Sequence, residues 1–218
     1  EGREREEIQR ILFELSAEAG NFAESVKHSY NSAVMLNLIF AKAHLAYRMK
    51  ATKPALNNEG NIELKKARHP LLNPKTVVPT DIRLGGEYDT LVITGPNTGG
   101  KTVSIKTIGL LTLMAMCGIL IPAADQSQIA VFKNVLVDVG DEQSIQQNLS
   151  TFSSHMVNII NIMKCADDNS LILIDELGAG TDPVEGAALA VSIIENLRKK
   201  GARIAATTHY AELKSYAL

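Results

Sequence analysis

A glycine-rich loop near the middle of the chain has the residue types and spacing that hold a phosphate. It reads GPNTGGKT, and its residues are Gly95, Pro96, Asn97, Thr98, Gly99, Gly100, Lys101 and Thr102. Glycine allows the backbone to wrap closely around an anion, so that successive N–H groups point at phosphate oxygens. In this pattern Lys101 reaches the β- and γ-phosphates, and the Thr102 hydroxyl is a ligand of Mg²⁺. The loop therefore predicts a P-loop that binds ATP with Mg²⁺, and a threonine at position 103 is expected as a further nucleotide-binding residue.

Two adjacent carboxylates follow a short apolar run later in the chain. Leu171–Ile174 has the composition of a buried strand, and Asp175 and Glu176 come directly after it. Ligands bind at the carboxyl edge of open α/β sheets, which is where this strand would deliver both side chains. We expect Asp175 to hold the metal through water and Glu176 to orient or deprotonate the attacking water. The alternative is a pair that caps the next helix, but Gly178–Gly180 separates the two.

One histidine stands in a similar position after the next predicted strand, Arg203–Thr207. His209 could form a hydrogen bond with the γ-phosphate or with the water that attacks it. The alternative is a histidine with an ordinary structural role. Its place beside the first two motifs favours function, so the predicted catalytic residues are Glu176, His209 and Lys101, and the predicted metal ligands are Thr102 and Asp175.

A group of hydroxyls precedes the carboxylate strand and points to a second subunit. A glutamate directly after the aspartate, with a histidine one strand later, favours an ABC-type ATPase, and no guanine-reading motif is present. Such enzymes need a helix from the opposite subunit. Ser150, Thr151 and Ser153 lie near the start of a predicted helix over about Ser153–Ala166, where a positive helix end could bind the partner's phosphate. The alternative is an ordinary serine cap, which explains one hydroxyl but not the group.

Composition sets the general class. The chain has 218 residues, 45% of them hydrophobic, and a net charge of −2, so no global basic field indicates nucleic acid. Its longest apolar stretch, Ile108–Ile121, is too short and too polar to span a bilayer. Cys117 and Cys165 both lie in apolar helical patterns, which predicts two buried thiols. We expect a cytoplasmic protein with no membrane partner.

The pattern along the chain predicts a helical segment over residues 1–60 and an ATPase domain over residues 61–218. Before Met49, apolar residues repeat at helical spacing with a break at Gly20-Asn21, which predicts an antiparallel helical pair forming an arm or a buttress. Thr52–Pro54 and Asn57–Gly60 are predicted loops. After them, strands alternate with helices, which is typical of an α/β domain with a largely parallel sheet. The expected strands are Ile62–Leu64, Leu91–Thr94, Ile129–Phe132, Val135–Val139, Leu171–Ile174 and Arg203–Thr207, and the expected helices are Lys101–Cys117, Ser153–Ala166 and Val184–Lys199.

Several of these motifs, in this order, resemble the MutS mismatch-repair ATPase family. The segments that carry the resemblance are Arg68–Leu72, Thr94–Thr102, Leu149–Phe152, Asp175–Asp182 and Thr208–Tyr210. Gly140–Ile145 and Gly180–Pro183 resemble the second bacterial branch of that family. The resemblance covers essentially the whole chain, and it implies an ABC-type P-loop fold preceded by the lower end of a pair of lever helices.

The resemblance also implies how the site is assembled. In such a family the protein is a homodimer with two composite ATP sites, to which Ser150 contributes in trans. Adenine would lie near Val77 and Val78, and Asp141–Gln143 would form the linker that senses the γ-phosphate. The chain begins without methionine and ends soon after His209, so we expect a fragment of a longer protein. The resemblance implies that the second branch has no mismatch-reading domain, and the nuclease domain typical of that branch is not in this sequence.

Three functions are then open. The resemblance to the second branch implies the first, an ATP-driven dimeric clamp on branched DNA that suppresses homologous recombination. It equally implies the second, an ATP-driven factor that acts on stalled or collided ribosomes. In either case the client would be bound largely by regions outside this chain. The third is a scaffold that dimerises on ATP binding with incidental turnover, although Glu176 and His209 argue against it.

Overall fold

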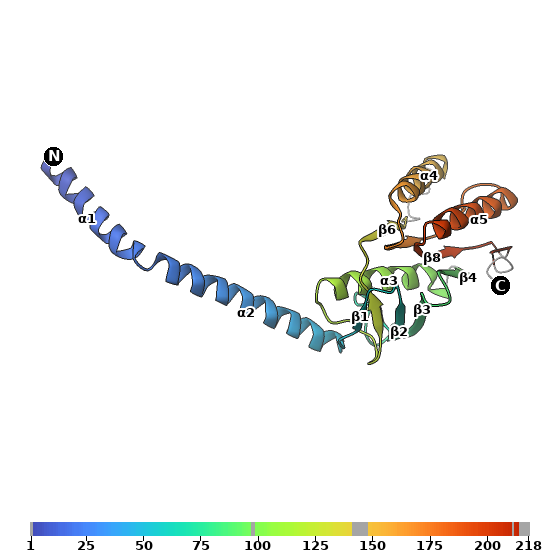
Figure 1. The fold of residues 1–218 in the computed structure, drawn as a ribbon, viewed down its shortest axis with the longest axis horizontal. Coiled ribbons are helices and arrows are strands. Elements are labelled where there is room, and N and C mark those ends of the chain that lie inside the picture. Colours follow the sequence, from blue (N-terminus) through green and yellow to red (C-terminus); the bar gives the residue numbers. More distant parts are fainter. Residues whose placement is uncertain (1, 97–98, 141–147, 211, 214–218) are drawn as a thin grey trace. The chain divides into compact units, whose positions relative to one another are not determined.

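The computed structural model describes residues 2–96, 99–140, 148–210, 212 and 213 (Figure 1), and of residues 148–151 it describes the backbone only. The chain divides into two compact units, one ending at Leu45 and the other beginning at Ala46. The predicted domains, residues 1–60 and 61–218, stay a prediction.

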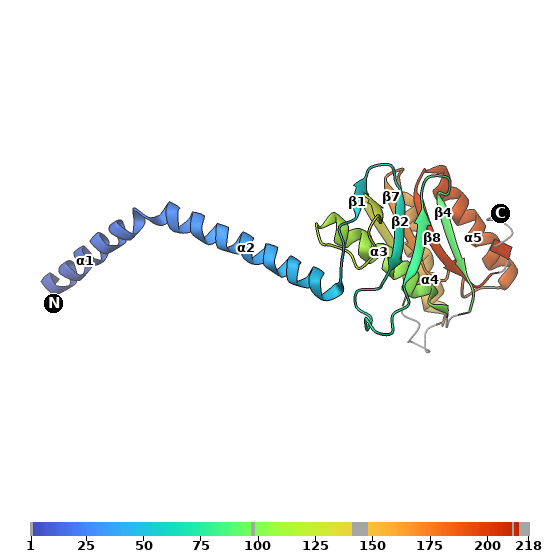
Figure 2. The same cartoon turned by 90° about the horizontal axis from the view of Figure 1, so that it is seen from below.

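The first unit consists of helix α1 (Gly2–Gly20) and most of helix α2 (Ala23–Met49). The expected antiparallel pair is wrong, since the two helices run end to end in both views (Figures 1 and 2). The Asn21 N–H donates to the Ala17 carbonyl, and the Val26 N–H donates to the Phe22 carbonyl. These helical bonds on both sides of the break keep the chain direction, and the apolar residues of α1 are exposed.

A four-stranded parallel sheet forms the centre of the second unit. Its strands are β4 (Thr90–Thr94), β8 (Arg203–Thr208), β7 (Ser170–Ile174) and β6 (Asn134–Asp138), in that order across the sheet. Every residue of β7 is buried, as expected for a central parallel strand covered on both faces. The predicted largely parallel sheet is confirmed.

A second sheet contains strands that the sequence did not predict. It has the order β1 (Ala55–Asn57), β5 (Gln128–Ala130), β2 (Ile62–Ala67) and β3 (Thr80–Leu84). The loop prediction at Asn57 is wrong because Ala55–Asn57 pairs in parallel with Gln128–Ala130. The β2–β3 pair is antiparallel and carries a register shift between Leu64 and Ala67.

Three helices complete the layers of this unit. Helix α3 (Lys101–Met116) packs between the two sheets, and α4 (Asn148–Cys165) and α5 (Pro183–Lys199) cover the other face of the parallel sheet (Figure 1). Strand β7 serves both cores, because Leu171 and Leu173 face α3 while Ile172 and Ile174 face α4 and α5. Gly109 allows α3 to approach β7 closely, since a Cβ there would lie 2.5 Å from Leu173 Cδ1.

Both cysteines are exposed, which corrects the prediction of two buried thiols. Cys117 follows the last turn of α3, and Cys165 is the last residue of α4. Both residues lie at helix ends that reach the surface, although α3 buries residues along most of its length. Among the described residues, no helix combines the length and apolar character needed to cross a membrane.

Candidate functional site

The glycine-rich loop joins the end of β4 to the start of α3. Gly95 has φ 141° and Gly100 has φ 75°, conformations that glycine adopts without strain. A Cβ added at either position would meet no atom of the described residues within 4 Å. The described part of the chain therefore leaves space beside both glycines, which suits a loop that must admit a ligand close to its backbone. Asn97 and Thr98, also predicted to bind the nucleotide, lie outside the described residues.

Lys101 is the first residue of α3, and its side chain points back into the loop. It is 4% exposed, and its Nζ donates to the Gly95 carbonyl at 2.5 Å. The same Nζ lies 3.0 Å from Nδ1 of His209. Because an ammonium can only donate, Nδ1 must be the acceptor in this pair.

Position 103 corrects one of the predicted nucleotide contacts. The expected threonine there is wrong, because the residue that follows Thr102 is Val103. Val103 lies in the first turn of α3 and is 38% exposed. Its side chain has no polar atom that could bind a phosphate or a metal ion, so the predicted binding residues of the loop end at Thr102.

The other ring nitrogen of His209 faces a carboxylate. Nε2 lies 3.1 Å from Oε1 of Glu176, which can only accept while it is ionised. We therefore assign His209 as the neutral tautomer with its hydrogen on Nε2. Lys101, His209 and Glu176 form one hydrogen-bonded chain, so the structure brings the three predicted catalytic residues together.

Thr207, which the sequence reasoning missed, fixes both carboxylate residues. Its buried hydroxyl donates to the Asp175 carboxylate and accepts from the Glu176 N–H at 2.8 Å. Asp175 is 6% exposed, and Glu176 has φ 53°, a left-handed conformation that is costly for a residue other than glycine. This turn at the end of β7 directs Glu176 to His209. In the sequence Thr207 is one of two adjacent threonines at the end of β8, and that pattern does not distinguish it from Thr208.

The predicted magnesium ligands are of a suitable kind for the ion. Thr102 lies in the first turn of α3 and Asp175 at the carboxyl edge of the sheet, where a hydroxyl and a carboxylate offer the oxygen ligands that Mg²⁺ prefers. No group of three or more His, Cys, Asp or Glu side chains within the described ranges could by itself hold a metal ion. The metal site stays a prediction that needs phosphate oxygens to complete it.

The remaining predicted residues are placed less fully. Ser150 lies in the first turn of α4, but its side chain is outside the described part of the chain, as are Asp141–Gln143. Val77 and Val78 lie in the loop between β2 and β3, and Val78 is 78% exposed. An adenine contact there stays a prediction.

The loop after Glu176 is packed against Tyr210. The Tyr210 hydroxyl donates to the Gly178 carbonyl at 2.8 Å, and burial together with Asp182 and Glu212 raises the pKa of Tyr210. Asp182 caps α5 by accepting from the Val184 N–H at 3.0 Å, with Pro183 in the first turn. The loop is thus held at both ends.

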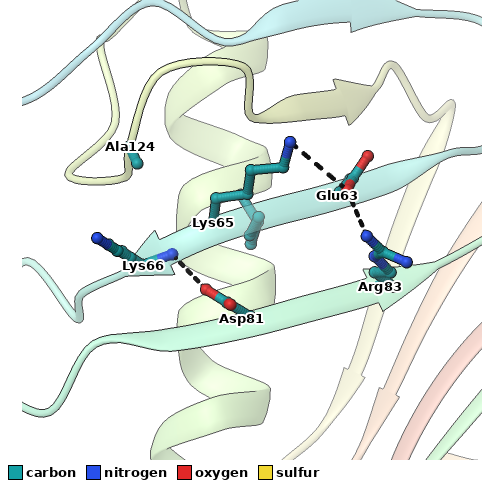
Figure 3. A pocket seen from close by; sticks show the side chains of 7 residues that line it. Glu63, Lys65, Lys66, Asp81, Arg83 and Ala124 are labelled. Carbon is teal, nitrogen blue, oxygen red and sulfur yellow. Dashed lines mark hydrogen bonds and ion pairs between the residues drawn. The ribbon is translucent and has the colours of Figure 1, made fainter.

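A separate hollow of about 240 Å³ lies on β2 and β3 (Figure 3). Its lining residues are Glu63, Leu64, Lys65, Lys66, Asp81, Arg83 and Ala124. Charges within it pair with one another, as Arg83 does with Glu63 at 3.1 Å. None of the predicted site residues whose side chains the structure describes lines this hollow.

A family model described as MutS domain V matches residues 91–217. This segment holds the parallel sheet, the glycine-rich loop and the hydrogen-bonded chain described above. The chain therefore belongs to the MutS family.

Similar proteins indicate which type of MutS-family protein the chain is. Endonuclease MutS2 of Caldanaerobacter subterraneus subsp. tengcongensis is 60% identical over 99% of the chain. The proteins of the same name from Geobacillus thermodenitrificans and Lachnospira eligens are 57% identical over 98% and 58% identical over 99% of it. Within the family the chain is of the MutS2 type and covers the ATPase domain. It spans 27% of the length of each of these relatives.

Proposed function

We propose that this domain binds MgATP on the Gly95–Thr102 loop and hydrolyses it to ADP and phosphate. The observation that carries the proposal is the chain from Lys101 through His209 to Glu176, which joins the phosphate loop to the proposed general base. A domain that only bound nucleotide would not need a carboxylate oriented in this way.

Each side chain has a distinct role in the proposed reaction. Glu176 accepts a proton from the attacking water, and the Nε2 hydrogen of His209 fixes the orientation of that carboxylate. Lys101 would donate to the phosphate oxygens, and Thr102 and Asp175 would hold the metal, with Asp175 fixed by Thr207. Bound Mg²⁺ would neutralise charge that develops on the phosphates.

Replacing Glu176 with Gln tests this proposal. The amide cannot accept the proton, so we expect kcat for ATP to fall by at least about 100-fold while ATP binding remains. Turnover would be measured by phosphate release, and affinity by equilibrium binding of a fluorescent ATP analogue. Glu87→Gln, on the exposed turn before β4, is the matched control. Unchanged turnover in Glu176→Gln would contradict the assignment.

We further propose that two such domains form the motor of a dimeric clamp on branched DNA, which suppresses homologous recombination. The family resemblance and the endonuclease names of the relatives support a DNA client. The ATPase chain itself is slightly acidic, so we assign the client-binding surface to the rest of the full-length protein.

Binding of the full-length protein to four-way junctions, plain duplex and ribosomes tests the choice of client. We expect tighter binding to the junction than to duplex at the same salt concentration, with an affinity that falls as salt rises. Equal affinity for junction and duplex, or preferential binding to ribosomes, would contradict the DNA clamp and leave the ATPase proposal standing.

A further inference from the structure

A buried carboxylate outside the phosphate loop has no role in the proposed reaction. Asp138 is the last residue of β6 and is 4% exposed. Its two carboxylate oxygens accept from α4, one from Nδ1 of His155 at 3.0 Å and the other from Nδ2 of Asn158 at 2.8 Å. Burying a charged group is costly unless it is paired and hydrogen-bonded, so these two donors are what make the position tolerable.

The backbone of Asp138 is hydrogen-bonded to that of Asp175, the proposed metal ligand. Its carbonyl accepts from the N–H of Asp175 at 2.8 Å. Strands β6 and β7 are parallel neighbours, with Asp138 opposite Ile174. The same residue therefore holds α4 through its side chain and the start of the Asp175–Glu176 turn through its backbone.

The ring of His155 also packs closely against the backbone that follows β6. A Cβ added at Gly140 would lie 2.8 Å from Cε1 and 2.9 Å from Nε2 of His155. A glycine is thus needed for the ring to sit where it does. In addition, Nδ2 of Asn158 donates to the Val137 carbonyl at 3.2 Å. Val137, before the end of β6, and Gly140, after it, both lie against α4.

The hydrogen bonds to Asp138 restrict movements of α4 that its apolar packing permits. The helix rests on the sheet through Ile159 and Ile162, both buried. Apolar contacts are not directional and permit small rotations or shifts, whereas hydrogen bonds to both oxygens of one carboxylate do not. Ser150 stands five residues before His155, about 7.5 Å along the helix axis. Fixing His155 and Asn158 therefore fixes the turn that carries Ser150.

We propose that Asp138, His155 and Asn158 are positioning residues that set the N-terminal half of α4 relative to Asp175. Through this contact the helix that serves the partner's nucleotide is held in register with the domain's own metal carboxylate. The inference rests on the proposed function, because it assigns α4 a task only if two domains share their ATP sites.

The test uses the full-length protein with four variants of α4. His155→Ala and Asn158→Ala each remove one donor. His155→Asn retains a donor close to the place of Nδ1. Asn161→Ala is the matched control, since Asn161 is exposed on the same helix. The readouts are kcat and KM for ATP, ADP affinity, and ATP-dependent dimerisation by sedimentation.

For His155→Ala we expect kcat to fall about tenfold and ATP-dependent dimerisation to weaken by a similar factor, with KM and ADP affinity within about twofold of wild type. His155→Asn should recover most of the loss. If His155→Ala folds poorly, the same pattern in Asn158→Ala supports the proposal. Values equal to those of Asn161→Ala would overturn it, as would a parallel loss of ADP affinity and dimerisation.

The Glu176→Gln variant separates the two proposals. If Glu176→Gln loses turnover and His155→Ala matches the control, only the positioning role fails. If Glu176→Gln retains turnover, the assignment of Glu176 as the general base fails, whatever the α4 variants show. The proposed function fails if the wild-type protein does not hydrolyse ATP.

Discussion

His209 has ring nitrogens that face groups of opposite kind, an ammonium at Nδ1 and a carboxylate at Nε2. Replacing it with Ala would leave Glu176 without this donor, so the carboxylate would no longer be oriented for the water. We expect His209→Ala to lower kcat by about 100-fold, toward the lower end of what a positioned acid–base group contributes. Nucleotide affinity should change less than about threefold. Steady-state turnover and equilibrium binding would measure the two quantities.

The exposed His28 on α2 provides the control, and His28→Ala should leave both quantities unchanged. A His209→Ala protein with normal turnover would show that the contact with Glu176 is incidental.

The environment of His69 predicts how the stability of the fold depends on pH. Burial and the nearby charge of Lys106 lower the pKa of His69, and its Nδ1 accepts from the Leu71 N–H at 3.3 Å. In the unfolded chain the pKa of a histidine is about 6.5, above that of His69 in the folded protein. As pH falls, the unfolded chain therefore binds more protons than the folded protein. The stability contributed by neutral His69 is thus present above about pH 6.5 and is lost as pH decreases toward the folded pKa.

Urea unfolding of the wild type and of His69→Gln between pH 8 and pH 5 would measure this contribution. We expect the difference in unfolding free energy between the two proteins to shrink toward pH 5. A constant difference for His69→Gln would contradict the assignment of a neutral, accepting His69.

At the residue scale, the sequence predicted the side chains whose motif and strand end coincide. Glu176 and His209 follow the ends of predicted strands, Lys101 begins the helix after the loop that follows another, and parallel pairing brings those strand ends together. Thr207 and Asp138 were missed for a physical reason. Their partners are chosen by strand order and helix placement, which no spacing within one segment encodes.

At the element scale, strong periodicity was informative and short strands were not. The helix at α3 and the strand at β7 were predicted to within one residue at each end. Strand β1 has three residues after a proline, and β3 buries only Ile82 and Leu84, so neither has enough alternation to stand out. The direction of the chain after α1 depended on backbone hydrogen bonds at Asn21, which side-chain patterns do not show.

The packing of the loop that follows Glu176 predicts how substitutions there change the unfolding free energy. Gly186 and Gly178 are packed against Tyr210, and a Cβ at Gly186 would overlap the Tyr210 hydroxyl oxygen and lie 2.7 Å from the Gly178 carbonyl oxygen. Tyr210→Phe removes one hydrogen bond and should lower the unfolding free energy by about 1 kcal/mol. Gly186→Ala must displace the loop or α5 and should cost about 1–3 kcal/mol.

Urea unfolding of the two single variants and the double variant would form a double-mutant cycle. Removing the hydroxyl relieves one of three close contacts and leaves those with Tyr210 Cζ and the Gly178 carbonyl oxygen. The combined loss should therefore be smaller than the sum of the separate losses. Additive losses would show that the clash with the Tyr210 hydroxyl is not what excludes a side chain at Gly186. Val184→Ala, exposed in the first turn of α5, is the control.

At the scale of the whole molecule, the site in one chain includes no described group from the first turn of α4, although that turn carries hydroxyls at a helix N-terminus. The loop, the carboxylates and His209 gather at the carboxyl edge of the sheet. The family resemblance implies that Ser150 serves the nucleotide of a partner subunit. ATP binding and dimerisation should then be coupled, with each favouring the other by the same factor.

Ser150→Ala in a Glu176→Gln background tests this coupling in the full-length protein. The background prevents hydrolysis, so ATP should hold the dimer long enough to be measured by sedimentation or light scattering. Removing one hydroxyl that donates to a charged phosphate should weaken ATP-dependent dimerisation by about tenfold or more, since such bonds contribute about 1.5–3 kcal/mol. Nucleotide affinity at protein concentrations too low for dimerisation should stay within about twofold. Ser154→Ala, exposed in the same helix, is the control. If Ser150→Ala lowered both quantities equally, Ser150 would act on its own chain's nucleotide or on folding, and the composite site would be wrong.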